Sequence, residues 1–151
     1  MNLPTSGRVL AIDLGTVRIG IAASDLTRTL ASPRAVLPRT PDLHKRIVRV
    51  VADEEATIVV VGLPKDLRGR EAQAATSARA EAEALATVLA PNGVPVVLVD
   101  ERMTSAAAHV GLAAAGHNTR QRRSTIDAAA AAVLLQSFLD GGCRGVAVVS
   151  P

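Results

Sequence analysis

The chain has 151 residues, of which 48% are hydrophobic and 21% charged. This length and composition predict one compact globular domain and exclude a disordered chain or a collagen-like repeat. No apolar run approaches the roughly 20 residues that cross a bilayer, and the first residues lack the pattern of a signal peptide. We therefore expect no membrane partner. The single Cys143 cannot form an internal disulfide, and one thiol without an export signal predicts a cytoplasmic protein.

The composition also limits how the chain would bind nucleic acid. It has one Phe and no Trp or Tyr, so it lacks the aromatic platform on which unpaired bases usually stack. Binding would depend on phosphates and shape. The net charge is only +3, but residues 102–126 contain four Arg and two His and no acidic residue. This segment predicts a phosphate-contacting surface, and the alternative is a solvated basic stretch.

Three strands are predicted first, and they are residues 8–13, 17–23 and 35–37. The first two form a hairpin, because an apolar run and an alternating run are separated by the turn residues Gly15 and Thr16. The third is expected to be short or to lie at an edge of the sheet, because Pro33 and Pro38 bracket it.

Helices and strands are then expected to alternate, and these elements are a helix over 41–55, a strand over 57–61, a helix over 71–90, a strand over 94–99, and helices over 104–115 and 124–139. Residues 65–70 and 118–123 are expected to be polar loops. This order predicts an α/β fold in which a mixed five-stranded sheet, with three antiparallel strands and then parallel strands, has helices on both faces. The domain would span 1–151, with its core over 8–139 and a short tail that we leave unplaced.

Three carboxylates lie at the ends of predicted elements. Asp13 ends the first strand, Glu101 follows the fifth, and Asp127 falls in the first turn of the last helix. The carboxyl ends of parallel strands form the crevice where ligands usually bind, so these acids are expected to converge. Asp127 also shares a helical stripe with Leu134 and Phe138, where an unpaired charge would be costly.

Each carboxylate has a plainer interpretation. With Ser124 as the N-cap, Asp127 would complete a capping box. Asp13 would close its hairpin with an Asx-type turn, and Glu101 would pair with Arg102 at the surface.

Taken together, the acids predict a site for phosphodiester hydrolysis with two metal ions. Two divalent ions can activate water and stabilise the leaving oxygen, and carboxylates suffice to hold Mg²⁺. The three histidines, His44, His109 and His117, show no metal-ligand spacing.

Five short segments then resemble the YqgF (RuvX) family of the RNase H-like nuclease superfamily, and they are Ala11–Thr16 with Gly20, Val61–Pro64 with Gly69, Arg79, Asp100–Thr104, and Ile126–Ala128 with Ala131. The resemblance implies an RNase H-like fold and a nuclease dependent on Mg²⁺ or Mn²⁺. It also implies that Asp13, Glu101 and Asp127 are the catalytic, metal-binding acids. The family's lysine before the last acid is replaced here by Arg122 or Arg123, and its aromatic residue after Arg79 is absent.

The family has been regarded both as the nuclease that matures the 5′ end of pre-16S rRNA and as a Holliday-junction resolvase. The resemblance favours rRNA, whereas cutting a junction would require a homodimer. Structured RNA or branched DNA would be bound by a set of polar and basic residues, which are Thr16, Lys65, Arg68, Arg70, Arg102, Arg120, Arg122 and Arg123.

Two other classes of protein fit part of this pattern. Residues 13–16 also resemble the phosphate-binding hairpin of the actin, Hsp70 and sugar-kinase superfamily. That class closes two such domains over ATP, and this chain has length for one. A non-catalytic binding module would leave three mutually repelling carboxylates unexplained.

Overall fold

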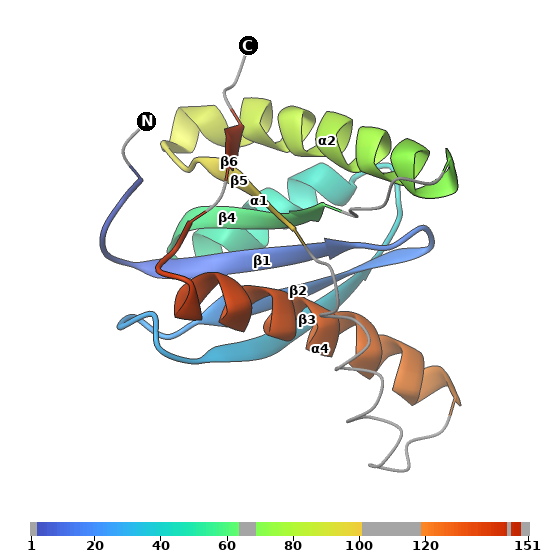
Figure 1. The fold of residues 1–151 in the computed structure, drawn as a ribbon, viewed down its shortest axis with the longest axis horizontal. Coiled ribbons are helices and arrows are strands. Elements are labelled where there is room, and N and C mark those ends of the chain that lie inside the picture. Colours follow the sequence, from blue (N-terminus) through green and yellow to red (C-terminus); the bar gives the residue numbers. More distant parts are fainter. Residues whose placement is uncertain (1–2, 64–68, 101–118, 145, 149–151) are drawn as a thin grey trace.

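The computed structural model describes residues 3–63, 69–100, 119–144 and 146–148. Within them, six strands form one mixed sheet in the order β3-β2-β1-β4-β5-β6, and helices lie on both of its faces (Figure 1). The five predicted strands are all present, and the predicted combination of antiparallel and parallel pairing is confirmed. No helix in these ranges is both long and apolar enough to cross a membrane.

The antiparallel part consists of β1 (Arg8–Leu14), β2 (Arg18–Ser24) and β3 (Ala31–Pro38). β3 lies at the edge, as predicted, but it is longer than the expected 35–37. A register shift next to Ala22, which pairs with Pro33, accommodates that proline. An edge strand tolerates a missing N–H because one side of its backbone has no partner strand.

The parallel part adds β4 (Ala56–Leu63) and β5 (Val96–Asp100) beside β1. Ile12 is in register with Val61, and Leu63 is in register with Asp100. The carboxyl ends of all three strands therefore lie together, at the edge of the sheet that is formed by strand ends. The unplaced tail contributes a sixth strand, β6 (Val146–Val148), which pairs antiparallel with β5. Three residues are too few to show the alternation that predicts a strand.

Four helical elements are described, and they are α1 (Leu43–Asp53), α2 (Gly69–Leu89), the 3-10 turn η1 (Ala90–Asn92) and α4 (Thr119–Asp140). α1 and α2 cover one face of the sheet, and α4 crosses β1, β2 and β3 on the other (Figure 1). The predicted helix over 104–115 lies outside the described residues.

Two apolar cores follow from the alternation of the strands. Ile12 and Ile21 pack with the helices α1 and α2, through residues such as Leu85. The alternate residues of the strands, such as Ala11, pack under α4 with Phe138. Burial of each large side chain contributes roughly 1.5–3 kcal/mol to the free energy of folding, so both cores stabilise the packing of the helices on the sheet.

The start of α4 corrects two predictions. The helix begins at Thr119, so the expected loop over 118–123 is wrong for residues 119–123, and Ser124 lies inside the helix rather than at its N-cap. The segment before Ser124 is rich in arginine and glutamine, which are good helix formers, and the helix continues through it. α2 likewise begins at Gly69, so Arg70 belongs to a helix and not to the expected loop.

Candidate active site

Asp13 lies at the carboxyl end of β1 and is half-buried. Val9 and Ala11 belong to the core beneath α4, so the strand's alternation assigns Asp13 to the same face. Its partner across the antiparallel pair is Gly20, which has no side chain. Gly20 is buried, and the Asp13 carboxylate therefore has no side chain opposite it on β2.

Glu101 comes directly after Asp100, the last residue of β5, and lies outside the described residues. Val97 and Val99 of β5 pack in the core under α4. β5 ends at the same edge of the sheet as β1, with β4 between them.

Asp127 lies in the interior of α4, where the structure describes the backbone. The predicted capping box is therefore wrong, because the helix begins at Thr119, more than one turn before Ser124. Position 127 precedes Ala131 and Leu134 by four and seven residues, and both are buried against the sheet. Such spacing keeps position 127 on the stripe of the helix that faces the sheet.

The predicted nucleic-acid-binding residues fall into three groups. Thr16 is exposed at the turn between β1 and β2. The backbones of four arginines lie in the first turns of helices, and these are Arg70 in α2 and Arg120, Arg122 and Arg123 in α4. Lys65, Arg68 and Arg102 lie outside the described residues.

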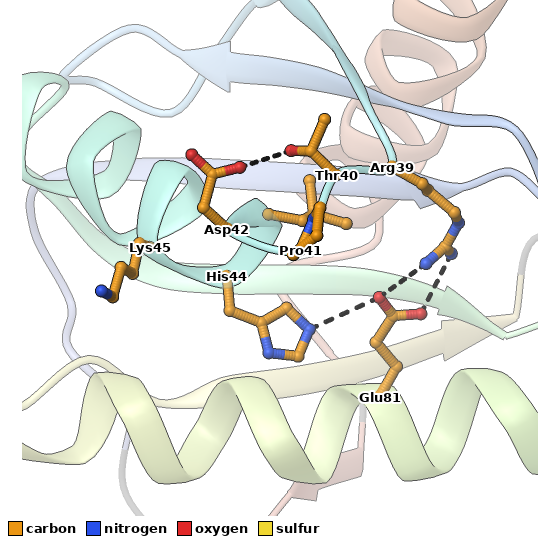
Figure 2. A pocket seen from close by; sticks show the side chains of 8 residues that line it. Arg39, Thr40, Pro41, Asp42, His44, Lys45 and Glu81 are labelled. Carbon is orange, nitrogen blue, oxygen red and sulfur yellow. Dashed lines mark hydrogen bonds and ion pairs between the residues drawn. The ribbon is translucent and has the colours of Figure 1, made fainter.

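The turn that carries Thr16 is held by a residue that the sequence alone does not single out. The backbone N–H of Arg39 donates to the carbonyl of Val17 at 3.2 Å, and its Nε donates to the carbonyl of Gly15 at 2.6 Å. Glu81 of α2 accepts from both terminal nitrogens of this guanidinium, each at 3.0 Å (Figure 2). No local pattern indicates this pair, because the two residues are 42 positions apart.

Two open hollows adjoin this cluster. One, of about 720 Å³, lies between residues 39–45 on one side and Glu81 of α2 on the other. Within it, His44 Nε2 lies 3.5 Å from the Glu81 carboxylate (Figure 2). The other, of about 420 Å³, lies under the turn and is lined by Thr16 and Ser77 among others. In the first hollow, the hydroxyl of Thr40 donates to Asp42 and lowers the pKa of that carboxyl.

The chemistry at Asp13 fits a hard divalent cation. A carboxylate supplies the oxygen ligands that Mg²⁺ prefers, and the glycine opposite adds no side chain that would compete for the ion. Among the side chains that the structure describes, no three His, Cys, Asp or Glu groups cluster as metal ligands. Of the three predicted ligands, only Asp13 has a described side chain.

Comparison with known proteins agrees with this architecture. The family model described as "RuvX: Holliday junction resolvase" matches residues 7–141. A Streptomyces avermitilis protein named "Putative pre-16S rRNA nuclease" is 46% identical over 136 residues, covering 89% of this chain and 86% of the relative. A relative of the same name from Mycobacterium sp. (strain KMS) is 42% identical over 151 residues, covering 98% and 87%.

A solved structure supports the fold. The structure titled "T. thermophilus RuvC in complex with Holliday junction substrate" superposes with a TM-score of 0.55 at 17% identity, covering 92% of this chain and 98% of that one. The predicted RNase H-like fold is thus confirmed. Because the family model matches residues 7–141 of the 151 and these relatives are more than 40% identical, the chain belongs to the RuvX family.

Proposed function

We propose that this chain is a metal-dependent nuclease that processes the 5′ end of pre-16S rRNA, with Asp13, Glu101 and Asp127 as its catalytic acids. The names of relatives at 41–46% identity support the substrate. The observation that carries the site is the position of Asp13, half-buried at the edge where the parallel strands end and on the face that α4 covers.

We expect the two other acids at the same place from the periods of β5 and α4. In β5, Val97 and Val99 alternate onto the α4 face, and position 101 is next in that alternation. In α4, position 127 lies one turn before the buried Ala131. Three carboxylates would thus meet in one pocket, delivered by the end of β1, the end of β5 and the helix α4.

Three carboxylates in one pocket repel one another, and a cation relieves this repulsion. Divalent cations bound there would supply activation of water and stabilisation of the leaving oxygen. The chain's own part is to hold the carboxylate oxygens at the sheet edge, where the residue opposite Asp13 on β2 is a glycine without a side chain.

Basic residues surround this edge in the proposal. The arginines in the first turns of α4 and α2 flank it from both sides of the sheet, and Thr16 lies on the adjoining turn. Arg side chains bind phosphates in bidentate fashion, which suits a structured RNA read through its backbone. The proposal includes the cytoplasm as the compartment, consistent with the free thiol of Cys143.

The test is digestion of a precursor rRNA leader with Mg²⁺ or Mn²⁺, by the wild-type chain and by Asp13→Asn. We expect trimming at the mature 5′ end by the wild type, and loss of cleavage in the variant with its thermal unfolding intact. The matched control is Asp25→Asn, a partly exposed carboxylate between β2 and β3, which should cleave normally. Undiminished cleavage by Asp13→Asn would refute the catalytic assignment.

The second candidate is cleavage of a four-way DNA junction, which the description of the matching family model favours. Two coordinated incisions require two active sites, so this function needs a symmetric dimer. Junction DNA digested beside the rRNA leader, together with sedimentation of the protein, separates the two substrates. Faster cutting of the junction by a dimer would replace the rRNA assignment.

A further inference from the structure

We propose that Arg39 is a positioning residue for the active site, which it serves by holding the β1–β2 turn from both sides of Thr16. Its backbone N–H donates to the carbonyl of Val17 at 3.2 Å, and its Nε donates to the carbonyl of Gly15 at 2.6 Å. One residue thus fixes the backbone before and after Thr16. The inference rests on the proposed nuclease function, because it concerns the turn that follows Asp13.

Glu81 fixes the guanidinium that binds the turn. Its two carboxylate oxygens accept from the two terminal nitrogens of Arg39 at 3.0 Å each, in the planar two-bond arrangement that specifies orientation (Figure 2). The Arg39 and Glu81 side chains are 32% and 17% exposed. Three of the five N–H donors of Arg39 are engaged within the protein, so its geometry suits positioning better than gripping a substrate phosphate.

The turn depends on this contact because apolar packing holds little of it. Val17 is 71% exposed, Thr16 is also exposed, and the hollow of about 420 Å³ lies beneath the turn. The hydrogen bonds from residue 39 therefore restrain its tip where packing does not. The backbone within the turn is closely spaced, since a Cβ on Gly15 would lie 2.3 Å from the carbonyl oxygen of Arg18.

A shift of this turn reaches the catalytic carboxylate through one residue. Asp13 and Gly15 are separated only by Leu14, the last residue of β1. When reacting groups are held in an attack geometry, a displacement of about 1 Å can cost on the order of 100-fold in rate. Arg39 therefore acts on the reaction through the backbone that carries Asp13 and Thr16, without touching the substrate.

The experiment separates the ion pair from the contact with the turn. The variants are Arg39→Ala and the exchange of charges Arg39→Glu with Glu81→Arg, which rebuilds the pair but leaves residue 39 no side-chain N–H to donate to Gly15. Arg34→Ala is the matched control, because Arg34 lies on β3, the strand that ends just before Arg39, and pairs with Glu54 at 3.1 Å. For each protein we would measure kcat, KM, the salt dependence of KM, the thermal unfolding temperature, and amide hydrogen exchange over residues 14–18.

We expect Arg39→Ala to lower kcat by about 10- to 100-fold, with KM and its salt dependence unchanged. The exchange variant should recover thermal stability but neither kcat nor slow amide exchange in the turn. Arg34→Ala should retain the wild-type kcat.

Two results would overturn the positioning role. If the exchange variant recovers kcat as well as thermal stability, the ion pair has only a structural role. If Arg39→Ala instead raises KM and weakens its salt dependence at unchanged kcat, Arg39 is a phosphate-binding residue. Wild type and Asp13→Asn run in the same assay: if they cleave equally, the proposed function fails and takes this inference with it. If Asp13→Asn is inactive while Arg39→Ala matches the wild type, only this inference fails.

Discussion

The substitution Gly15→Ala adds a single methyl group to the turn beside the candidate active site. The new Cβ would lie 2.3 Å from the backbone carbonyl oxygen of Arg18, against 3.4 Å or more in an ordinary contact. The obstacle is backbone, so the turn itself must move by about 1 Å rather than a flexible side chain giving way. Overpacking of this kind costs roughly 1–3 kcal/mol of unfolding free energy.

The same displacement sets the expected effect on activity. Asp13 lies two residues before Gly15, and Thr16 lies one residue after it. A misplacement of about 1 Å costs on the order of 100-fold in rate. We therefore expect kcat/KM for cleavage of the precursor rRNA leader to fall by about that factor, far more than the loss of stability alone would produce.

Gly93→Ala is the matched control for this prediction. Gly93 has φ +70°, and a Cβ added there would meet nothing within 4 Å, so alanine costs about 1–2 kcal/mol through the backbone conformation alone. Its unfolding free energy should fall about as far as that of Gly15→Ala while its cleavage rate stays normal. Full activity in Gly15→Ala, or an equal loss in Gly93→Ala, would refute the argument that the turn positions the site.

Three further predictions concern stability and binding. Phe138→Ala should lower the unfolding free energy by about 3–5 kcal/mol, because this residue of α4 is 2% exposed and packs against the sheet; a fall in unfolding temperature of less than about 5 °C would contradict it. The pKa of Asp25 is lowered from 3.8 to about 2, chiefly by the hydroxyl of Thr27 and then by backbone N–H groups. Its stabilising contribution is therefore complete above pH 4 and is lost as the pH falls towards 2, and urea unfolding of Asp25→Asn should lack this loss. Replacing both Arg122 and Arg123 by Ala should flatten the slope of log K against log salt for rRNA binding by about 1–2, whereas an unchanged slope would remove them from the interface.

The strands were predictable wherever their residues show a period of two. The run before Asp13 and the alternating run after Thr16 predict β1 and β2 to within a residue, and β4 reads as a buried parallel strand because it is apolar throughout. β3 is longer than predicted because pairing with β2 continues past Pro33 through a register shift. β6 is held by β5, a neighbour that no local pattern in the tail reveals.

Helix ends were less predictable than helix positions. Ser124 has the residue type and spacing of an N-cap, yet α4 begins at Thr119, because a cap preference is worth about 1 kcal/mol and gives way where a helix can continue. This difference bears on the site, since it removes the capping interpretation of Asp127.

The candidate site also contains residues that the sequence predicts and residues that it does not. Asp13 could be assigned to the sheet edge from the sequence, because its place in a strand follows from alternation. Arg39 and Glu81 could not, because they meet only when β3 and α2 are folded against the same hairpin. Contacts between residues far apart in the chain leave no period in the sequence around either partner.

The position of a bound ion tests the proposed metal site most directly. Crystals soaked in Mn²⁺ and measured at the manganese absorption edge would show each ion as an anomalous difference peak. We predict a peak about 2.1 Å from a carboxylate oxygen of Asp13, with oxygens of Glu101 or Asp127 in the same coordination sphere. Peaks only at sites out of reach of Asp13, or carboxylates 101 and 127 on separate flanks of the molecule, would contradict it.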